Sequence, residues 1–167
     1  IATAHGVTPD WVLMGCGSTE ILRVAVMAFC RPDRPLVTAA PTFEEPVRMA
    51  TVLKVPVVEV AVDRAMRLDL EGMSRAAAPS AGLVFVCNPN NPTGKVFSLE
   101  EMEFIAGLCR EFDALCFTDE IYEHILYPRD GAEIKHISMA QLDGMRDRTV
   151  VVNSMSKTYS VTGWRVG

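Results

Sequence analysis

The sequence lacks the signals of several protein classes. No apolar stretch reaches the roughly 18 residues that would indicate a membrane-spanning helix. No basic segment followed by an apolar core marks a secretion signal. The net charge is −5 and the basic residues are scattered along the chain, which is not the pattern of a nucleic-acid-binding protein. We therefore expect no membrane and no nucleic acid among the binding partners.

The cysteines also lack an informative pattern. They are five in number, an odd count, and no two of them form a C-x-x-C pair. Both a disulfide framework and a cysteine-based metal site are therefore poorly supported. We expect buried, reduced thiols in a cytoplasmic protein without a bound metal. The cysteines are Cys16, Cys30, Cys87, Cys109 and Cys116.

The chain contains neither internal repeats nor low-complexity linkers. Its 167 residues are the size of one domain, and 49% hydrophobic with 22% charged residues is the composition of an ordinary globular protein. It opens at Ile1 without a methionine and stops at Gly167 directly after a motif. We interpret it as a piece of a longer protein.

Short β-rich runs alternate with helical segments. Strands are expected at residues 36–40, 55–62, 83–87, 114–118 and 149–153, and helices at 20–29, 43–53 and 99–112. Ser98 and Glu101 form a capping box at the start of the last helix. Several strands are apolar on both faces, which is typical of parallel strands covered by helices on each side. The pattern predicts a doubly wound α/β fold, a three-layer αβα sandwich with a mostly parallel sheet. In such sheets ligands bind at the carboxyl ends of the strands.

A glycine-rich turn precedes the first helix, with the sequence Gly15-Cys16-Gly17-Ser18-Thr19-Glu20. The glycines permit a close approach, and the N–H groups of Ser18 and Thr19 would face an anion with the helix dipole behind them. Neither a dinucleotide fingerprint nor a P-loop fits, because Glu20 occupies the place of the third glycine and no G-K-S/T follows. An ordinary capped helix is the alternative for this segment.

Two further segments follow predicted strands. Phe43, in Pro41-Thr42-Phe43, is an aromatic ring at a strand end that can stack on a flat cofactor, with core packing as the alternative. Asn88-Pro89-Asn90-Asn91-Pro92-Thr93-Gly94 predicts a rigid turn. Asn91 is the best candidate in it to donate a hydrogen bond to a ring oxygen. A structural turn without a ligand remains open.

Asp119 ends the fourth predicted strand, in Asp119-Glu120-Ile121-Tyr122. A carboxylate in a dry cleft can pair with a protonated ring nitrogen. Tyr122 would donate its hydroxyl to the ring oxygen beside Asn91. A metal site is the alternative, but Glu120 should point away from Asp119 and no histidine ligand pattern accompanies them. We interpret the other nearby acids and all the histidines as structural or surface groups: Glu120, Glu123, His5, His124 and His136.

The last motif is Ser154-Met155-Ser156-Lys157, followed by Arg165 in Gly163-Trp164-Arg165-Val166-Gly167. The Lys157 amine can form a Schiff base, while the Ser154 hydroxyl and the Arg165 guanidinium hold a phosphate on the same molecule. A bare S-x-x-K also occurs in serine hydrolases, so this motif alone does not identify the role of Lys157. The interpretation depends on the other segments.

Together, in this order, the five segments resemble the large domain of fold-type-I pyridoxal-phosphate enzymes, the class I/II aminotransferases. The resemblance implies pyridoxal phosphate as cofactor, with Lys157 as Schiff-base lysine and proton shuttle. It implies that Asp119 pairs with the pyridine nitrogen and that Asn91 and Tyr122 bond the ring hydroxyl oxygen. Phe43 would stack on the ring. The phosphate would be held by the Gly17-Ser18-Thr19 turn with Ser154 and Arg165.

The activity implied is transfer of an amino group between an amino acid and a 2-oxo acid, in a full-length homodimer. Residues 1–167 would be a partial large domain, with the small C-terminal domain and the N-terminal arm outside it. The part through Asn91 resembles histidinol-phosphate-type enzymes, and the part from Ser98 onward resembles the aspartate and aromatic subgroup. The alternatives are a carbon–sulfur β-lyase of the same fold, a pyridoxal-phosphate-sensing domain of a transcription regulator, and an isolated piece without activity.

Overall fold

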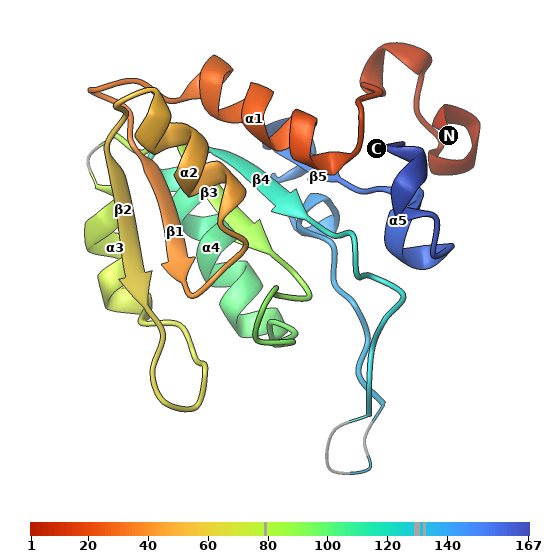
Figure 1. Ribbon diagram of the computed structural model, residues 1–167. Helices are drawn as coiled ribbons and strands as arrows, with labels where there is room; N and C mark the ends of the chain where they lie inside the picture. Colours follow the sequence, from red (N-terminus) through yellow and green to blue (C-terminus); the bar gives the residue numbers. More distant parts are fainter. Residues whose placement is uncertain (79, 129–130, 132) are drawn as a thin grey trace.

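The five strands form one parallel sheet in a computed structural model that describes residues 1–78, 80–128, 131 and 133–167 (Figure 1). Their order across the sheet is β2-β1-β3-β4-β5, and each neighbouring pair is parallel. The strands are β1 (Leu36–Ala40), β2 (Val57–Ala61), β3 (Leu83–Cys87), β4 (Leu115–Asp119) and β5 (Thr149–Val152). Because all of them run the same way, their carboxyl ends lie along one edge of the sheet.

Helices connect the strands. The α-helices are α1 (Ser18–Phe29), α2 (Glu45–Val52), α3 (Leu70–Ala77), α4 (Leu99–Glu111) and α5 (Met155–Thr158). Short 3₁₀ helices are η1 (Ala2–His5), η2 (Pro9–Trp11), η3 (Met139–Gln141), η4 (Arg146–Arg148) and η5 (Thr162–Trp164). None of the helices in the described part of the chain combines the length and the apolar character needed to cross a bilayer.

The central strand β3 shows why the fold has three layers. All of its residues are buried. Leu83, Phe85 and Cys87 pack with the apolar faces of α1 and α2, whereas Val84 and Val86 pack with α3 and α4. Alternate side chains point to opposite faces, so an uninterrupted apolar strand requires a helical layer on each side. The predicted αβα sandwich is confirmed.

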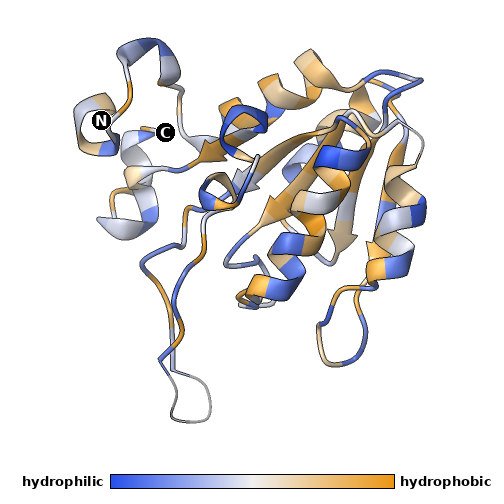
Figure 2. Ribbon diagram, turned by 180° about the vertical axis from the view of Figure 1, so that it is seen from behind, coloured by the Kyte–Doolittle hydropathy of each residue, from blue (hydrophilic) through white to orange (hydrophobic). Residues whose placement is uncertain are grey.

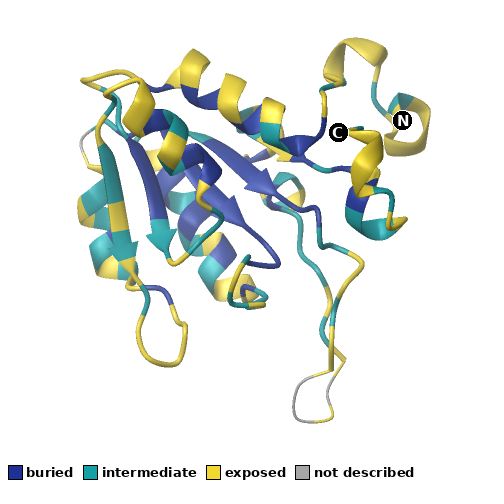
Figure 3. Cartoon of the chain, in the orientation of Figure 1, coloured by how far each residue is buried: buried dark blue, intermediate teal, exposed yellow. Residues whose placement is uncertain are grey.

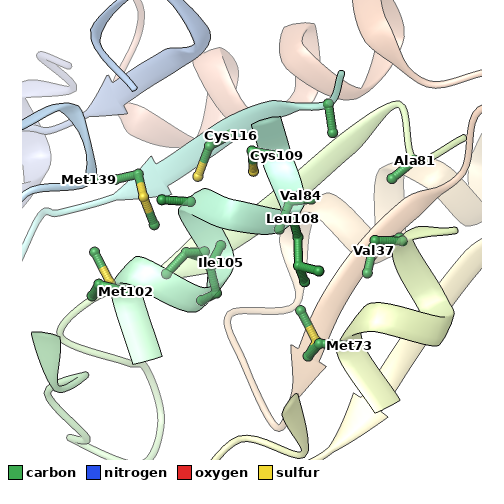
Figure 4. Close-up of a cluster of buried hydrophobic side chains, with 14 of the residues drawn as sticks. Val37, Met73, Ala81, Val84, Met102, Ile105, Leu108, Cys109, Cys116 and Met139 are labelled. Atoms are coloured by element: carbon green, nitrogen blue, oxygen red, sulfur yellow. The ribbon is translucent and has the colours of Figure 1, made fainter. Parts of the chain in front are cut away.

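The two cores are visible in the figures. Figure 4 shows the core on the α3 and α4 side, where Met73, Met102 and Ile105 gather beside Val84. In Figure 2 the strands are mostly hydrophobic, whereas the helices on the α3 and α4 side carry hydrophilic residues as well. Figure 3 shows the central strands β3 and β4 as mostly buried, the edge strand β2 as intermediate to exposed, and much of the helix surface as exposed.

Most predicted boundaries agree with the structure. β1 and β3 have the predicted bounds, β4 begins and ends one residue later than predicted, and β5 ends one residue earlier. β2 is shorter than the predicted 55–62, since it begins two residues later and ends one residue earlier. Helix α1 begins at Ser18, two residues earlier than predicted, with Gly17 as its N-cap. Pro46 lies in the first turn of α2. Backbone N–H groups in this turn have no partner within the helix, so a proline costs no helical hydrogen bond. The capping box of Ser98 and Glu101 is present in α4.

Two expectations were incomplete. The sequence pattern predicts no helix between β2 and β3, yet α3 lies there, capped by Asp69, which accepts a hydrogen bond from Gly72 N (2.9 Å). An acceptor cap followed by buried Met73 and Ala77 was the available signal. All five cysteines are free, but Cys16 is exposed because it lies in the glycine turn outside both cores; the other four are buried as expected.

The capping box allows a first test of the local energetics. Replacing Ser98 with Ala removes the acceptor for Glu101 N (3.2 Å) and should lower the free energy of unfolding by about 1 kcal/mol. Urea denaturation measures the change. Glu103→Ala, at an exposed position of the same helix, is the control and should change stability by less than about 0.5 kcal/mol. Equal effects of the two substitutions would contradict the capping role.

Candidate functional site

A solvent-open cleft with about 520 Å³ of empty volume lies at the carboxyl ends of the strands. Its lining comes from the loops after β1, β3, β4 and β5 and from the start of α1. Every residue that the sequence predicts for the site lines this cleft except Gly17. The lining residues are Ser18, Thr19, Phe43, Asn91, Asp119, Ile121, Tyr122, Ser154, Ser156, Lys157, Thr162 and Arg165.

The two ends of the chain meet at one side of the cleft, next to α5 (Figure 1). Gly15 N donates to Gly167 O (2.7 Å) and Gly167 N to Gly15 O (3.1 Å). Ser154 Oγ donates to Val166 O (2.8 Å), which joins the end of β5 to the same segment. The glycine turn, Ser154 and Arg165, which are far apart in the sequence, are thereby held together.

Gly17 lies directly behind Arg165. It has a φ of 77° and ψ of 163°, a backbone region that residues with a Cβ rarely adopt. A Cβ at this position would lie 2.5 Å from Arg165 Nη2. The first-turn N–H groups of Ser18 and Thr19 have no intrahelical partner, as at any helix start. Arg165 and the two residues that carry these N–H groups line the same cleft, an arrangement suited to a phosphate.

The three asparagines of the turn after β3 differ in what they bind. Asn88 donates to Ile137 O (3.3 Å) and accepts from Phe97 N (3.1 Å). Asn90 is also engaged by protein groups. The side chain of Asn91 makes no hydrogen bond with the described residues and lines the cleft. Among the described residues, Asn91 is thus the asparagine of this turn whose side-chain amide is free; its hydrogen bond to a ring oxygen stays a prediction.

Asp119 is the last residue of β4, and only 3% of it is exposed. Burial raises the pKa of its carboxyl from 3.8 to about 6. A weak bond from Ile121 N (3.4 Å) lowers this pKa, and the negative charge of Glu120 raises it. A cationic group placed in the cleft would stabilise the ionised carboxylate, so the site favours a protonated base as ligand.

Glu120 points away from the cleft, as expected. Its Oε1 accepts from Thr118 Oγ1 (3.1 Å) and Ser138 Oγ (2.9 Å), and its Oε2 lies 2.8 Å from His136 Nε2. The sequence spacing does not reveal this partner of His136. Glu120, Glu123 and His136 bring possible ligand atoms within 4.8 Å of one another, but hydrogen bonds already occupy both Glu120 oxygens. The structural interpretation of Glu120 and His136 is therefore retained.

Lys157 lies on α5, half-buried, with its Nζ 5.7 Å from the centroid of the Tyr122 ring. Within the described residues no acid pairs with its amine. Three lining residues were missed by the sequence analysis: Ile121, Ser156 and Thr162. Ser156 was detectable as the second hydroxyl of the lysine motif, and its Oγ lies 2.8 Å from Ser154 Oγ.

The fold and the cleft define an α/β protein whose candidate site is formed by loops at the strand ends. These loops bring the amine of Lys157 and the buried carboxylate of Asp119 to one cleft. Residues 1–167 match the family model described as aminotransferase class I and II. The chain belongs to this family.

Individual relatives agree with the family assignment. The chain is 37% identical over 165 residues to an aspartate aminotransferase of Pinus pinaster, covering 96% of this chain and 32% of that protein. A structure of Thermus thermophilus aspartate aminotransferase (a double mutant) superposes with a TM-score of 0.87 at 32% identity, covering 96% of this chain and 41% of that one. The N-succinyldiaminopimelate aminotransferase of Mycobacterium tuberculosis gives 0.85 at 28% identity, with 93% and 40% covered. The chain thus spans about a third to two fifths of the length of these relatives.

Gly17 provides a test of the phosphate side of the cleft. Gly17→Ala forces a Cβ against Arg165 at an unfavourable φ and should lower the free energy of unfolding by roughly 1–3 kcal/mol. Gly107→Ala, in the middle of α4 with no atom within 4 Å of the new Cβ, should instead raise stability by up to about 1 kcal/mol. Denaturant unfolding of both variants measures this difference in sign. A neutral or stabilising Gly17→Ala would show that Arg165 does not require the glycine.

Asp119 provides a test with a pH dependence. The pKa of Asp119 is higher in the folded protein than in the unfolded chain, so the protonated side chain stabilises the fold. This stabilisation is complete below pH 3.8 and is lost as the pH rises through about 6. Without ligand, Asp119→Asn should therefore be more stable than the unaltered protein at pH 7.5, by up to about 3 kcal/mol. This advantage should vanish near pH 4. The measurement is urea unfolding at both pH values, with exposed Asp143→Asn as the control that shows no such change.

Proposed function

We propose that this chain forms the cofactor-binding part of a pyridoxal-phosphate-dependent aminotransferase that transfers an amino group between an amino acid and a 2-oxo acid. The observation that carries the proposal is the single cleft lined by Lys157, Asp119 and Arg165. Family membership and relatives named as aminotransferases support the same reaction and not the lyase or regulator alternatives.

The residues present fit the cofactor. The free amide of Asn91 and the unpaired amine of Lys157 offer groups for the ring substituents, and buried Asp119 offers a carboxylate whose charge needs a cation. Gly17 leaves room for the Arg165 guanidinium beside the start of α1. When bound, pyridoxal phosphate supplies an aldehyde that links to amines and a ring that withdraws electrons from the substrate.

Each side chain then has a distinct task. Asp119 would hold a proton on the ring nitrogen, since a buried carboxylate next to a cation favours the ion pair. Asn91 and Tyr122 would donate hydrogen bonds to the ring hydroxyl oxygen, and Phe43 would stack on the ring. The amine of Lys157 would hold the aldehyde of the cofactor, and as a free amine it would remove the proton from the substrate α-carbon. Ser18, Thr19, Ser154 and Arg165 would hold the phosphate.

Several wider properties belong to the same proposal. We infer that residues 1–167 are part of the large domain of the protein and that the complete protein acts as a homodimer. The five free cysteines support a reducing, cytoplasmic location. Amino acids and 2-oxo acids are the proposed substrates.

Lys157 provides the most direct test of the proposed function. In the full-length protein, Lys157→Ala should abolish the covalent, borohydride-reducible attachment of the cofactor and lower kcat by at least about a thousandfold, because the chemical step loses its base and anchor. Mass spectrometry after borohydride treatment should place the cofactor on Lys157. Lys135→Ala, exposed on the surface, is the control and should retain attachment and turnover. Full turnover by Lys157→Ala would refute the assignment.

A further inference from the structure

The carboxyl ends of β1 and β3 form a fork. These two strands pair with each other only over residues 36–38 and 83–85. Beyond that point β1 remains hydrogen-bonded to β2, and β3 remains hydrogen-bonded to β4. At the point of divergence Thr38 Oγ1 donates to Phe85 O (3.1 Å). Past it, the ends of both strands line a mostly apolar cavity with about 410 Å³ of empty volume, together with Met73 of α3 and Ile105 of α4. Backbone pairing therefore does not fix the spacing of the loops that follow β1 and β3.

Asn90 bridges the open end of this fork. Its Nδ2 donates to Pro41 O (3.0 Å), which belongs to the loop after β1, and to Thr93 Oγ1 (2.8 Å) in its own turn. Its Oδ1 accepts from Thr42 Oγ1 (3.1 Å). The carbonyl of Pro41 can only accept, so this contact fixes which amide atom faces it. With 8% of Asn90 exposed, these bonds have little competition from water.

The same two loops line both cavities. Thr42 and Asn90 line the fork, whereas their neighbours Phe43 and Asn91 line the cleft. Asn91 is tied to β3, since its backbone N–H donates to Cys87 Sγ (3.4 Å). The side chain of Asn90 joins this turn to the loop that carries Phe43 through Pro41 O and Thr42 Oγ1. Cys87 Sγ is a second link, because it interacts with the N–H groups of both Asn91 and Phe43. The separation of Phe43 and Asn91 in the cleft thus depends in part on a contact that Asn90 makes outside it.

We propose that Asn90 is a positioning residue for the cofactor ring: it holds the loop of Phe43 at a fixed spacing from the loop of Asn91. This inference rests on the proposed function, because it assumes that a flat ring lies between these two residues. Among the described residues, Asn90 makes no hydrogen bond to the phosphate side of the cleft, which is built from α1, α5 and Arg165. Loss of Asn90 should therefore disturb ring binding and leave phosphate binding intact.

The test uses Asn90→Asp in the full-length protein. The carboxylate places an acceptor against Pro41 O, so the bond across the fork is replaced by repulsion while Thr42 can still donate. The dissociation constant for pyridoxal phosphate should rise about tenfold, the effect of losing one buried hydrogen bond. The absorption maximum of the bound cofactor should shift as the bond from Asn91 weakens. The dissociation constant for inorganic phosphate should stay within about twofold, since ring spacing does not affect the groups that bind it.

A second pair of variants avoids a new charge. Thr42→Val keeps the shape of the side chain but removes the donor to Asn90 Oδ1, and it should weaken pyridoxal phosphate binding in the same direction. Thr51→Val is the matched control, because the Thr51 hydroxyl donates to Val47 O (2.9 Å) on the exposed side of α2. It should leave both dissociation constants unchanged.

The outcomes separate the two claims. Unaltered protein that fails to bind pyridoxal phosphate would overturn the proposed function. Normal binding by that protein together with unchanged affinity and spectrum in Asn90→Asp and Thr42→Val would overturn the positioning role alone. Equal loss of pyridoxal phosphate and inorganic phosphate would also overturn it, because Asn90 would then support the fold in general and not the ring.

Discussion

Parallel backbone pairing of five strands is the constraint from which the rest of the structure follows. It places every carboxyl end at one edge of the sheet, so residues of strand-end loops as far apart in the chain as Phe43 and Arg165 open onto one cleft. β3 can occupy the centre because both of its faces are apolar and each is covered by helices. The core thus serves the site indirectly, by fixing where the strands end.

The site holds groups that do not favour folding. Asp119 is buried without a cationic partner in the described residues, and its raised pKa expresses the cost of ionising it there. Gly17 and Arg165 both have a positive φ at the point where the ends of the chain meet. Unpaired buried charges and unfavourable backbone angles are common at ligand-binding sites, because interactions with the ligand offset their cost. Both carboxylate oxygens of the neighbouring Glu120 accept hydrogen bonds. The lack of a partner is therefore specific to Asp119, which faces the cleft.

Local sequence signals account for much of the fold. The bounds of β1 and β3 and the capping box of α4 were predictable because each depends on residues next to one another in the chain. Helix α3 was not predicted, although Asp69 marks its start, because Gly72 and the short length weaken the periodic pattern. Glu120 and His136 are 16 residues apart, the described residues between them form neither a helix nor a strand, and no spacing rule predicts such a contact.

Motifs and hydrophobic periodicity are local properties, so the residue types of the site, their order, and the alternation of strands and helices can be read from the chain alone. Which side chains are free for a ligand depends on the folded protein. Asn88, Asn90 and Asn91 are chemically identical, yet the fork between β1 and β3 engages Asn90, the loop before η3 engages Asn88, and Asn91 alone faces the cleft. That distinction arises from contacts between distant segments, and these exist only once the sheet has formed.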